Sequence, residues 1–206
     1  MPQSSDTELL NEIKELRAEL QRLKDIEAVR RTKYKYWRCF DTADLAGMKE
    51  VLHEDVTLSV VAGVYSMVLK GRDAYLQMVK EGAHAEMVSH HHGHNGEIDI
   101  VSDTEALATW YLYDDLYEFR RNIRLYGTAF YRDKYLKVDG RWQLWYSQFH
   151  RVAEFCDPLT ERPNITYHYL ESHGFKHAGD TPLAPYPKDT AYRHPAGVLP
   201  PFLDAK

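Results

Sequence analysis

Residues 125–152 read LYGTAFYRDKYLKVDGRWQLWYSQFHRV, and this stretch decides the fold. Apolar and aromatic residues alternate with polar ones on both sides of the dipeptide Asp139-Gly140. An Asp-Gly pair between two alternating segments is a strong signal for a two-residue β-hairpin turn. The sequence therefore predicts two long antiparallel strands, at residues 125–138 and 141–155.

The chain before this hairpin carries helical patterns first and strand patterns later. Helices are expected at residues 7–24, in two segments of 25–52 separated by a break at Asp41–Asp44, and at 72–83. Further strands are expected at 55–61, 64–71, 86–101, with a bulge at Gly93, and 104–119. Helices followed by long antiparallel strands predict an α+β domain, in which a curved sheet wraps around helices.

A short heptad pattern marks the first helix. Its apolar residues are spaced alternately four and three apart: Leu9, Ile13, Leu16, Leu20 and Leu23. Fewer than three heptads make a weak coiled coil on their own. This apolar seam is therefore expected to pack either on its own domain or on a sister subunit.

Composition and sequence pattern divide the chain into three regions. Residues 1–24 form an N-terminal helix, residues 25–156 the domain itself, and residues 157–206 an irregular C-terminal arm. Eight of the nine prolines lie in the arm, which also contains six aromatic residues. Because disordered tails are poor in aromatic residues, an ordered arm is expected, packed on its own domain or on a neighbour.

Overall composition excludes several classes of protein. The net charge of −5 does not favour binding to nucleic acid. No apolar run approaches the length of a membrane span, and no signal-peptide core is present, so a cytoplasmic protein is expected. Two cysteines give neither a disulfide framework nor a metal-ligand spacing. Fifteen tyrosines and four tryptophans suit a cavity for a large, mostly apolar ligand.

Four histidines stand together in SHHHGHNGEI, residues 89–98. Strand alternation places His90, His92 and His94 on one face and His91 on the other. One hypothesis is that His90, His92 and His94 bind a metal ion together with a carboxylate. The carboxylates considered for such a site are Asp114, Asp115 and Glu97.

A second hypothesis needs no metal, only one inward histidine paired with Asp41. A carboxylate fixes the tautomer of an imidazole and raises its pKa, which suits proton transfer near neutral pH. Tyr36, in the same helical segment, is a possible acid or hydrogen-bond donor. Alternation isolates His91 as the inward residue, with His94 as the second candidate beyond the expected bulge.

Two further charged residues end apolar strand faces. Asp114 follows Ala108, Trp110 and Leu112 on one face, and a carboxylate there is costly unless it is paired. Arg151 is expected to share a face with Trp145 and Phe149. It is either the partner of Asp114 or an anchor for a polar group of a substrate.

These segments resemble the SnoaL-like branch of the nuclear transport factor 2-like superfamily. The resemblance covers residues 24–152, through KDIEAVRRTKYKYWRCFD, SHHHGHNGEI, ATWYLYDDL and the hairpin stretch. It is nearest to the bacterial bile-acid 7-alpha-dehydratases, among relatives such as scytalone dehydratase. It implies a cone-shaped antiparallel sheet with a deep cavity, elimination without cofactor or metal, and often a trimer. Its catalytic residues fall on His91, Asp41, Tyr36, Asp114 and Arg151.

Taken together, the sequence predicts a cofactor-independent lyase. It would eliminate water, or a small carbonyl such as formaldehyde, from an apolar aryl or polycyclic compound, for example a lignin-derived biaryl or a steroid-like molecule. The residues expected to bind this substrate are Trp110, His94, Tyr126 and Phe149. A metal-dependent enzyme, an isomerase and a non-catalytic binding module are the alternatives.

Overall fold

The computed structural model describes residues 3–176 of the 206-residue chain. Four helices are present in this part: α1 (Gln3–Asp41), α2 (Leu45–Val51), α3 (Arg72–Gly82) and α4 (Tyr169–His173). The strands are β1 (Leu52–Val61), β2 (Ser66–Lys70), β3 (Met87–Ile100), β4 (Glu105–Glu118), β5 (Ile123–Val138) and β6 (Arg141–Pro158). The elements expected from the sequence are therefore all found.

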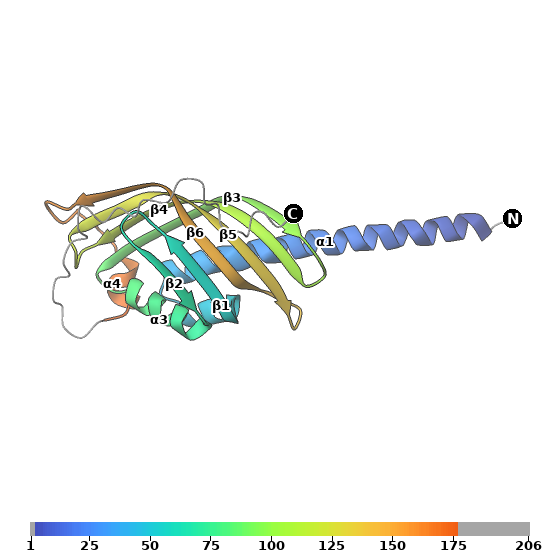
Figure 1. The fold of residues 1–206 in the computed structure, drawn as a ribbon, viewed down its shortest axis with the longest axis horizontal. Coiled ribbons are helices and arrows are strands. Elements are labelled where there is room, and N and C mark those ends of the chain that lie inside the picture. The colour runs from blue at the N-terminus through green and yellow to red at the C-terminus, as the bar shows by residue number, and fades with distance from the viewer. Residues whose placement is uncertain (1–2, 177–206) are drawn as a thin grey trace.

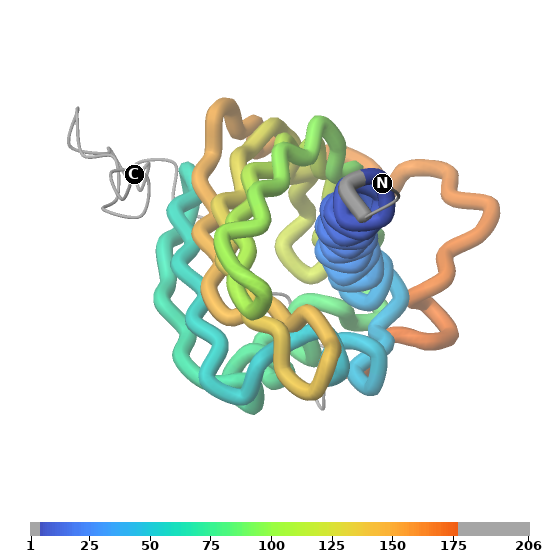
Figure 2. The backbone as a smooth tube through the Cα atoms, turned by 90° about the vertical axis from the view of Figure 1, so that its right-hand side faces the viewer, coloured from blue at the N-terminus to red at the C-terminus, as the bar shows by residue number. Residues whose placement is uncertain are grey.

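The six strands form one curved sheet in the order β2-β1-β6-β5-β4-β3 (Figure 1). Neighbouring strands are antiparallel except β1 and β6, which are parallel. Viewed along the axis of α1, the sheet forms an arc, with the helix against its open side (Figure 2). The expected α+β fold, a cone-shaped, mostly antiparallel sheet packed on helices, is confirmed.

The hairpin between β5 and β6 turns as expected. Val138 pairs with Arg141, and the two residues between them have positive φ, 50° for Asp139 and 75° for Gly140. Positive φ at both central positions defines a type I′ turn, whose twist matches that of the flanking strands. This turn fixes the register of the two longest strands.

Helix α1 is a single uninterrupted element that leaves the domain at its N-terminal end (Figure 1). Asp25 is its first buried residue, and the side chains of residues 5–24 are exposed apart from the half-buried Ile13. The division at residue 24 remains a prediction. So does the ordered C-terminal arm, because residues 177–206 lie outside the described part.

Two expectations about strand register are wrong. The bulge in β3 lies at Asn95 and Gly96, opposite Trp110, and not at Gly93. Gly93 pairs regularly with Leu112, and the absence of a side chain there leaves room for the Trp37 ring. A second bulge leaves Trp145 unpaired in β6, so this residue does not share a face with Phe149 and Arg151.

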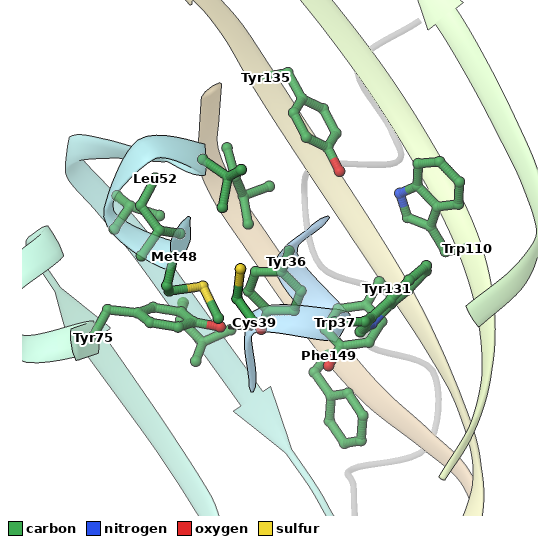
Figure 3. Close-up of a cluster of buried hydrophobic side chains, with 14 of the residues drawn as sticks. Tyr36, Trp37, Cys39, Met48, Leu52, Tyr75, Trp110, Tyr131, Tyr135 and Phe149 are labelled. Carbon is green, nitrogen blue, oxygen red and sulfur yellow. Dashed lines mark hydrogen bonds between the residues drawn. The ribbon is translucent and has the colours of Figure 1, made fainter. Parts of the chain in front are cut away.

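Aromatic side chains dominate the core between α1 and the sheet (Figure 3). The Trp37 ring meets the edge of Trp110 with ring centroids 5.7 Å apart. Tyr36 meets Tyr75 and Tyr131 in the same edge-to-face manner, at 5.9 and 6.2 Å. Each such contact adds to the stability that burial provides and fixes the orientation of the rings.

One ion pair lies wholly inside this core. The ammonium of Lys33 is 2.8 Å from Asp133, and both side chains are fully buried. Asp133 also accepts hydrogen bonds from Tyr135 and Ser147, and the ammonium lies 3.6 Å from the centroid of the Tyr131 ring. Burial lowers the pKa of Lys33, against the attraction of Asp133.

Candidate active site

The structure brings His91 and Asp41 into direct contact. The His91 Nδ1 atom lies 2.6 Å from Asp41 Oδ1, and the backbone N–H of His91 donates to Oδ2 at 2.9 Å. Ser89 donates a third hydrogen bond to this carboxylate, at 2.7 Å. Because Asp41 is the last residue of α1 and His91 lies in β3, the pair joins the helix to the sheet.

This contact controls the protonation of His91. Burial opposes charge on the imidazole, but the Asp41 carboxylate outweighs it and raises the pKa of His91. Burial likewise opposes charge on Asp41, while His91 and Ser89 together lower the pKa of its carboxyl group. An ionised Asp41 accepts a hydrogen bond from Nδ1–H, which leaves Nε2 as the nitrogen that can exchange a proton with a ligand.

His91 opens onto a cavity of about 630 Å³ between the sheet, α1 and α3. The walls are mostly apolar or aromatic. Their residues include Phe40, Leu58, Val60, Met67, Met78, Met87, Leu116, Tyr131 and Phe149. Phe40 meets the edge of the His91 ring at 5.0 Å between centroids, which restricts the rotation of the imidazole. A cavity of this size and lining suits a mostly apolar organic molecule.

Asp114 reaches the same cavity from β4. It lies opposite His91 in the register of β3 and β4, and its side chain is almost fully buried. Arg151 donates to Asp114 at 2.5 Å and to Glu154 at 2.8 Å. Of the two roles considered for Arg151, the structure shows the partner of Asp114, and the guanidinium lies behind the cavity wall.

Tyr36 places a phenol in the cavity wall, beside the hydroxyl of Tyr75, to which it is hydrogen-bonded. Burial, followed by the proximity of Tyr75, raises the pKa of Tyr36 well above its usual value. The phenol therefore stays protonated over the working pH range and can donate a hydrogen bond.

A second polar pair lines the cavity, and sequence reasoning missed it. His84 Nε2 lies 2.9 Å from Glu118 Oε2, and the Nδ1 of His84 accepts the backbone N–H of Glu86 at 3.1 Å. Glu118 is four residues beyond Asp114 on β4, so about 14 Å of strand separates them. Strand alternation from Asp114 is a signal that could have put Glu118 on the same face, whereas its contact with His84 joins residues 34 positions apart.

The sequence pattern of the SnoaL-like domain family matches residues 21–148. The chain belongs to the SnoaL-like domain family. Among solved structures, a candidate scytalone dehydratase from Novosphingobium aromaticivorans is similar, with 21% identity and a TM-score of 0.59, over 69% of this chain and 97% of that one. A hexachlorocyclohexane dehydrochlorinase from Novosphingobium barchaimii gives 17% identity and a TM-score of 0.61, over 72% and 99%.

A third structure has the same fold. It is a nuclear transport factor 2-like protein with a cystatin-like fold from Novosphingobium aromaticivorans, with 18% identity and a TM-score of 0.56, over 66% of this chain and 88% of that one. At such identities the structural similarity establishes the fold and not the activity. The expected superfamily is confirmed for this SnoaL-like domain, whereas the bile-acid branch remains an expectation.

Three of the four residues expected to bind substrate in this SnoaL-like domain lie outside the cavity. His94 and Tyr126 are on the outer face of the sheet, where they contact Tyr111 and Phe155 respectively. Trp110 is on the inner face but is fully buried under Trp37, next to the β3 bulge. Phe149 lines the cavity, as expected from its strand position.

The other histidines of the run lie on the outer face of the SnoaL-like sheet. His90 and His92 are exposed, with ring centroids 6.2 Å apart, and Asp115 on that face pairs with Arg124. Within residues 3–176, no group of three or more His, Cys, Asp or Glu side chains is arranged to hold a metal ion. No helix in the same range is long and apolar enough to span a membrane.

Proposed function

We propose that this protein is a cofactor-independent lyase that eliminates water or formaldehyde from an apolar aryl or polycyclic compound. The observation that carries the proposal is the 2.6 Å contact between His91 and Asp41 at the wall of a mostly apolar cavity. A carboxylate-held imidazole next to an apolar binding space is suited to removing a proton from a bound organic molecule.

His91 is the proposed base. With Asp41 accepting a hydrogen bond from Nδ1–H, neutral His91 presents the lone pair of Nε2 to the substrate. As Nε2 takes a proton, positive charge develops on the ring, and the Asp41 carboxylate stabilises it at short range. The backbone N–H of His91 holds the carboxylate in place, so the pair needs little rearrangement during the reaction.

The departing hydroxyl group needs a proton or a hydrogen bond. Tyr36 is the proposed donor, because its phenol stays protonated and is positioned by the hydroxyl of Tyr75. In a dehydration, His91 removes a C–H proton, its electron pair forms the C=C bond, and the C–O bond breaks to release water. Asp114, held by Arg151, is proposed to orient the hydroxyl groups of the substrate.

The same groups support loss of formaldehyde from an aryl propanediol. His91 then removes the proton of the terminal hydroxyl group, whose oxygen forms the C=O bond of formaldehyde. The C–C bond to the terminal carbon breaks, and its electron pair forms the new C=C bond. The benzylic C–O bond breaks at the other end, and the leaving oxygen departs as water with a proton from Tyr36.

The dimensions of the cavity support an elongated substrate. About 14 Å of strand separates Asp114 from Glu118, with Leu116 between them on the same face. Aromatic and methionine side chains line this interval. A molecule with two rings spans it, with the reacting carbon near His91 and a polar substituent near His84 and Glu118.

The comparisons support the reaction class. The names of two similar structures, a scytalone dehydratase candidate and a hexachlorocyclohexane dehydrochlorinase, describe the loss of water and of hydrogen chloride. Both losses are eliminations, which begin with the removal of a proton. The family match supports a fold shared with these structures, and His91, held by Asp41, is the proposed base.

The test uses a 1,2-diarylpropane-1,3-diol and, in parallel, a hydroxysteroid, with products separated by liquid chromatography and identified by mass. His91→Ala should lower kcat by about 10²–10⁴-fold on whichever compound is converted. His90→Ala is the matched control, since this neighbour is exposed on the outer face, and it should retain the wild-type rate. A His91→Ala variant with the wild-type rate would overturn the proposal, as would tight binding of these compounds without any turnover.

A further inference from the structure

The projecting half of α1 carries an apolar seam that no described residue covers. Exposed fractions are 55% for Leu9, 64% for Leu16, 51% for Leu20 and 52% for Leu23. Residues 5–24 extend about 30 Å along the helix axis and point away from the sheet (Figure 1). The sequence predicted that this seam packs on its own domain or on a sister subunit. The described residues exclude the first of these.

The spacing of the seam is that of a coiled coil. Leu9, Leu16 and Leu23 fall on one set of core positions, seven residues apart, and Ile13 and Leu20 fall on the other. Leucine throughout the first set with a β-branched residue, Ile13, in the second is a combination that favours two parallel strands. The seam ends where α1 enters the domain, at the buried residues Asp25 and Val29.

Charges beside the seam specify its partner. In a parallel pair of helices, the residue just before Ile13 or Leu20 lies against a residue of the partner helix whose number is five higher. Glu12 would face Arg17 of a second copy, and Glu19 would face Lys24, so both of these pairs join opposite charges. In an antiparallel pair, glutamates would face glutamates and basic residues would face basic residues, which is repulsive.

We propose that residues 5–24 form a parallel two-stranded coiled coil with a second copy of this chain. The charge pattern is complementary to itself in one orientation only, which is the property required for self-association. A short coiled coil on its own lacks a nucleated helix, and here the domain provides one. Because α1 continues into the core through Val29, Lys33 and Tyr36, the helix is already nucleated before two copies meet.

Sedimentation velocity of the full chain over a range of concentrations tests the association. The wild-type protein should show a reversible equilibrium between one and two chains. The double variant Leu16→Asp/Leu23→Asp should raise the dissociation constant by about a hundredfold or more, because both charges enter the seam. The control Ala18→Asp/Gln21→Asp adds the same charge on the opposite face and should leave the constant unchanged.

Disulfide trapping tests the orientation. In a Cys156→Ser background, which removes the exposed native cysteine, Leu9→Cys should form a covalent dimer under mild oxidation. Asn11→Cys, on the outer face of the same turn, should not. Circular dichroism checks that each variant keeps its helix content, which is expected because the altered side chains are exposed in one chain.

Several results would overturn the proposal. A chain that stays monomeric at every concentration would do so, as would a dissociation constant that is the same in the seam variant and the control. Equal cross-linking of the two cysteine variants would exclude the parallel seam. A mass of three chains, the assembly expected from the family resemblance, would exclude a two-stranded coil.

Discussion

Replacing Asp41 with asparagine changes one oxygen to an amide group and leaves the shape of the side chain intact. In the wild-type protein, Oδ1 accepts from His91 Nδ1 and from Ser89, and Oδ2 accepts from the backbone N–H of His91. Asparagine has only one oxygen. If that oxygen keeps the backbone hydrogen bond, the amide N–H₂ faces Nδ1, which must then be unprotonated. The proton moves to Nε2, and His91 can no longer act as a base.

The opposite orientation of the amide preserves the active tautomer at a cost. The amide N–H₂ would then face the backbone N–H of His91, and an unsatisfied buried donor costs about 1–3 kcal/mol. Loss of the charged hydrogen bond to the imidazolium in the transition state adds about 1.5–3 kcal/mol. Together these terms correspond to a decrease in kcat of about 10²–10⁴-fold at about 1.4 kcal/mol per factor of ten.

Two measurements check this reasoning for Asp41→Asn. Steady-state kinetics on the converted substrate give the decrease in kcat, and nitrogen NMR of labelled histidine reports which ring nitrogen of His91 carries the proton. The expected result is a large loss of rate together with a proton on Nε2. A variant that keeps the wild-type rate, whichever ring nitrogen of His91 carries the proton, would refute the role assigned to the pair.

Three other outcomes are expected. The plot of kcat/KM against pH should rise with pH through an inflection above 6.5, because neutral His91 is the base and Asp41 raises its pKa; an inflection below 6.5 would contradict this. Lys33→Met should lower the free energy of unfolding by about 3–5 kcal/mol in urea titration, since Asp133 is left buried and unpaired. Gly93→Ala should lower the melting temperature, because the added methyl group would overlap the Trp37 ring, 1.9 Å away.

Matched controls accompany the two stability predictions. Lys35→Met removes a lysine whose pair with Glu50 is exposed, and the free energy of unfolding should change by less than about 1 kcal/mol. Gly140→Ala meets no atom within 4 Å, so its effect should be limited to the strain of a positive φ, about 1 kcal/mol. Variants of Lys33 and Gly93 that are as stable as these controls would contradict the described packing.

Sequence reasoning located the secondary structure well because the signals are local. The Asp139-Gly140 turn and the alternation on both sides of it depend on neighbouring residues alone. Alternation also separated His91 from His90 and His92, and the structure places the three side chains accordingly. The contact between His91 and Asp41 joins residues 50 positions apart; it was one of two hypotheses drawn from strand alternation, and the family resemblance selected the same pair.

The errors arose where a strand is irregular, or where a side chain lies deeper in the core than its strand face indicates. Alternation assumes regular pairing, so the bulges at Asn95 and at Trp145 could not be placed by counting. Trp110 lies on the expected face but under Trp37, which is a matter of depth in the core. Tyr126 lies on the outer face, since its neighbour Leu125 takes the position toward the cavity.

Strand β6 contains two residues in excess of its partner β5, Trp145 and Val152, and beyond the second the alternation of faces returns to its original phase. Only residues 146–151 are therefore out of phase with the rest of the strand. Deleting Trp145 alone would restore regular pairing at the first bulge without changing which of these residues face the cavity. Residues 146–151 thus form one block whose alternation starts anew after Trp145, and Phe149 faces the cavity in that new phase. An alignment with a relative that lacks the bulges would assign this block to the wrong side of the sheet.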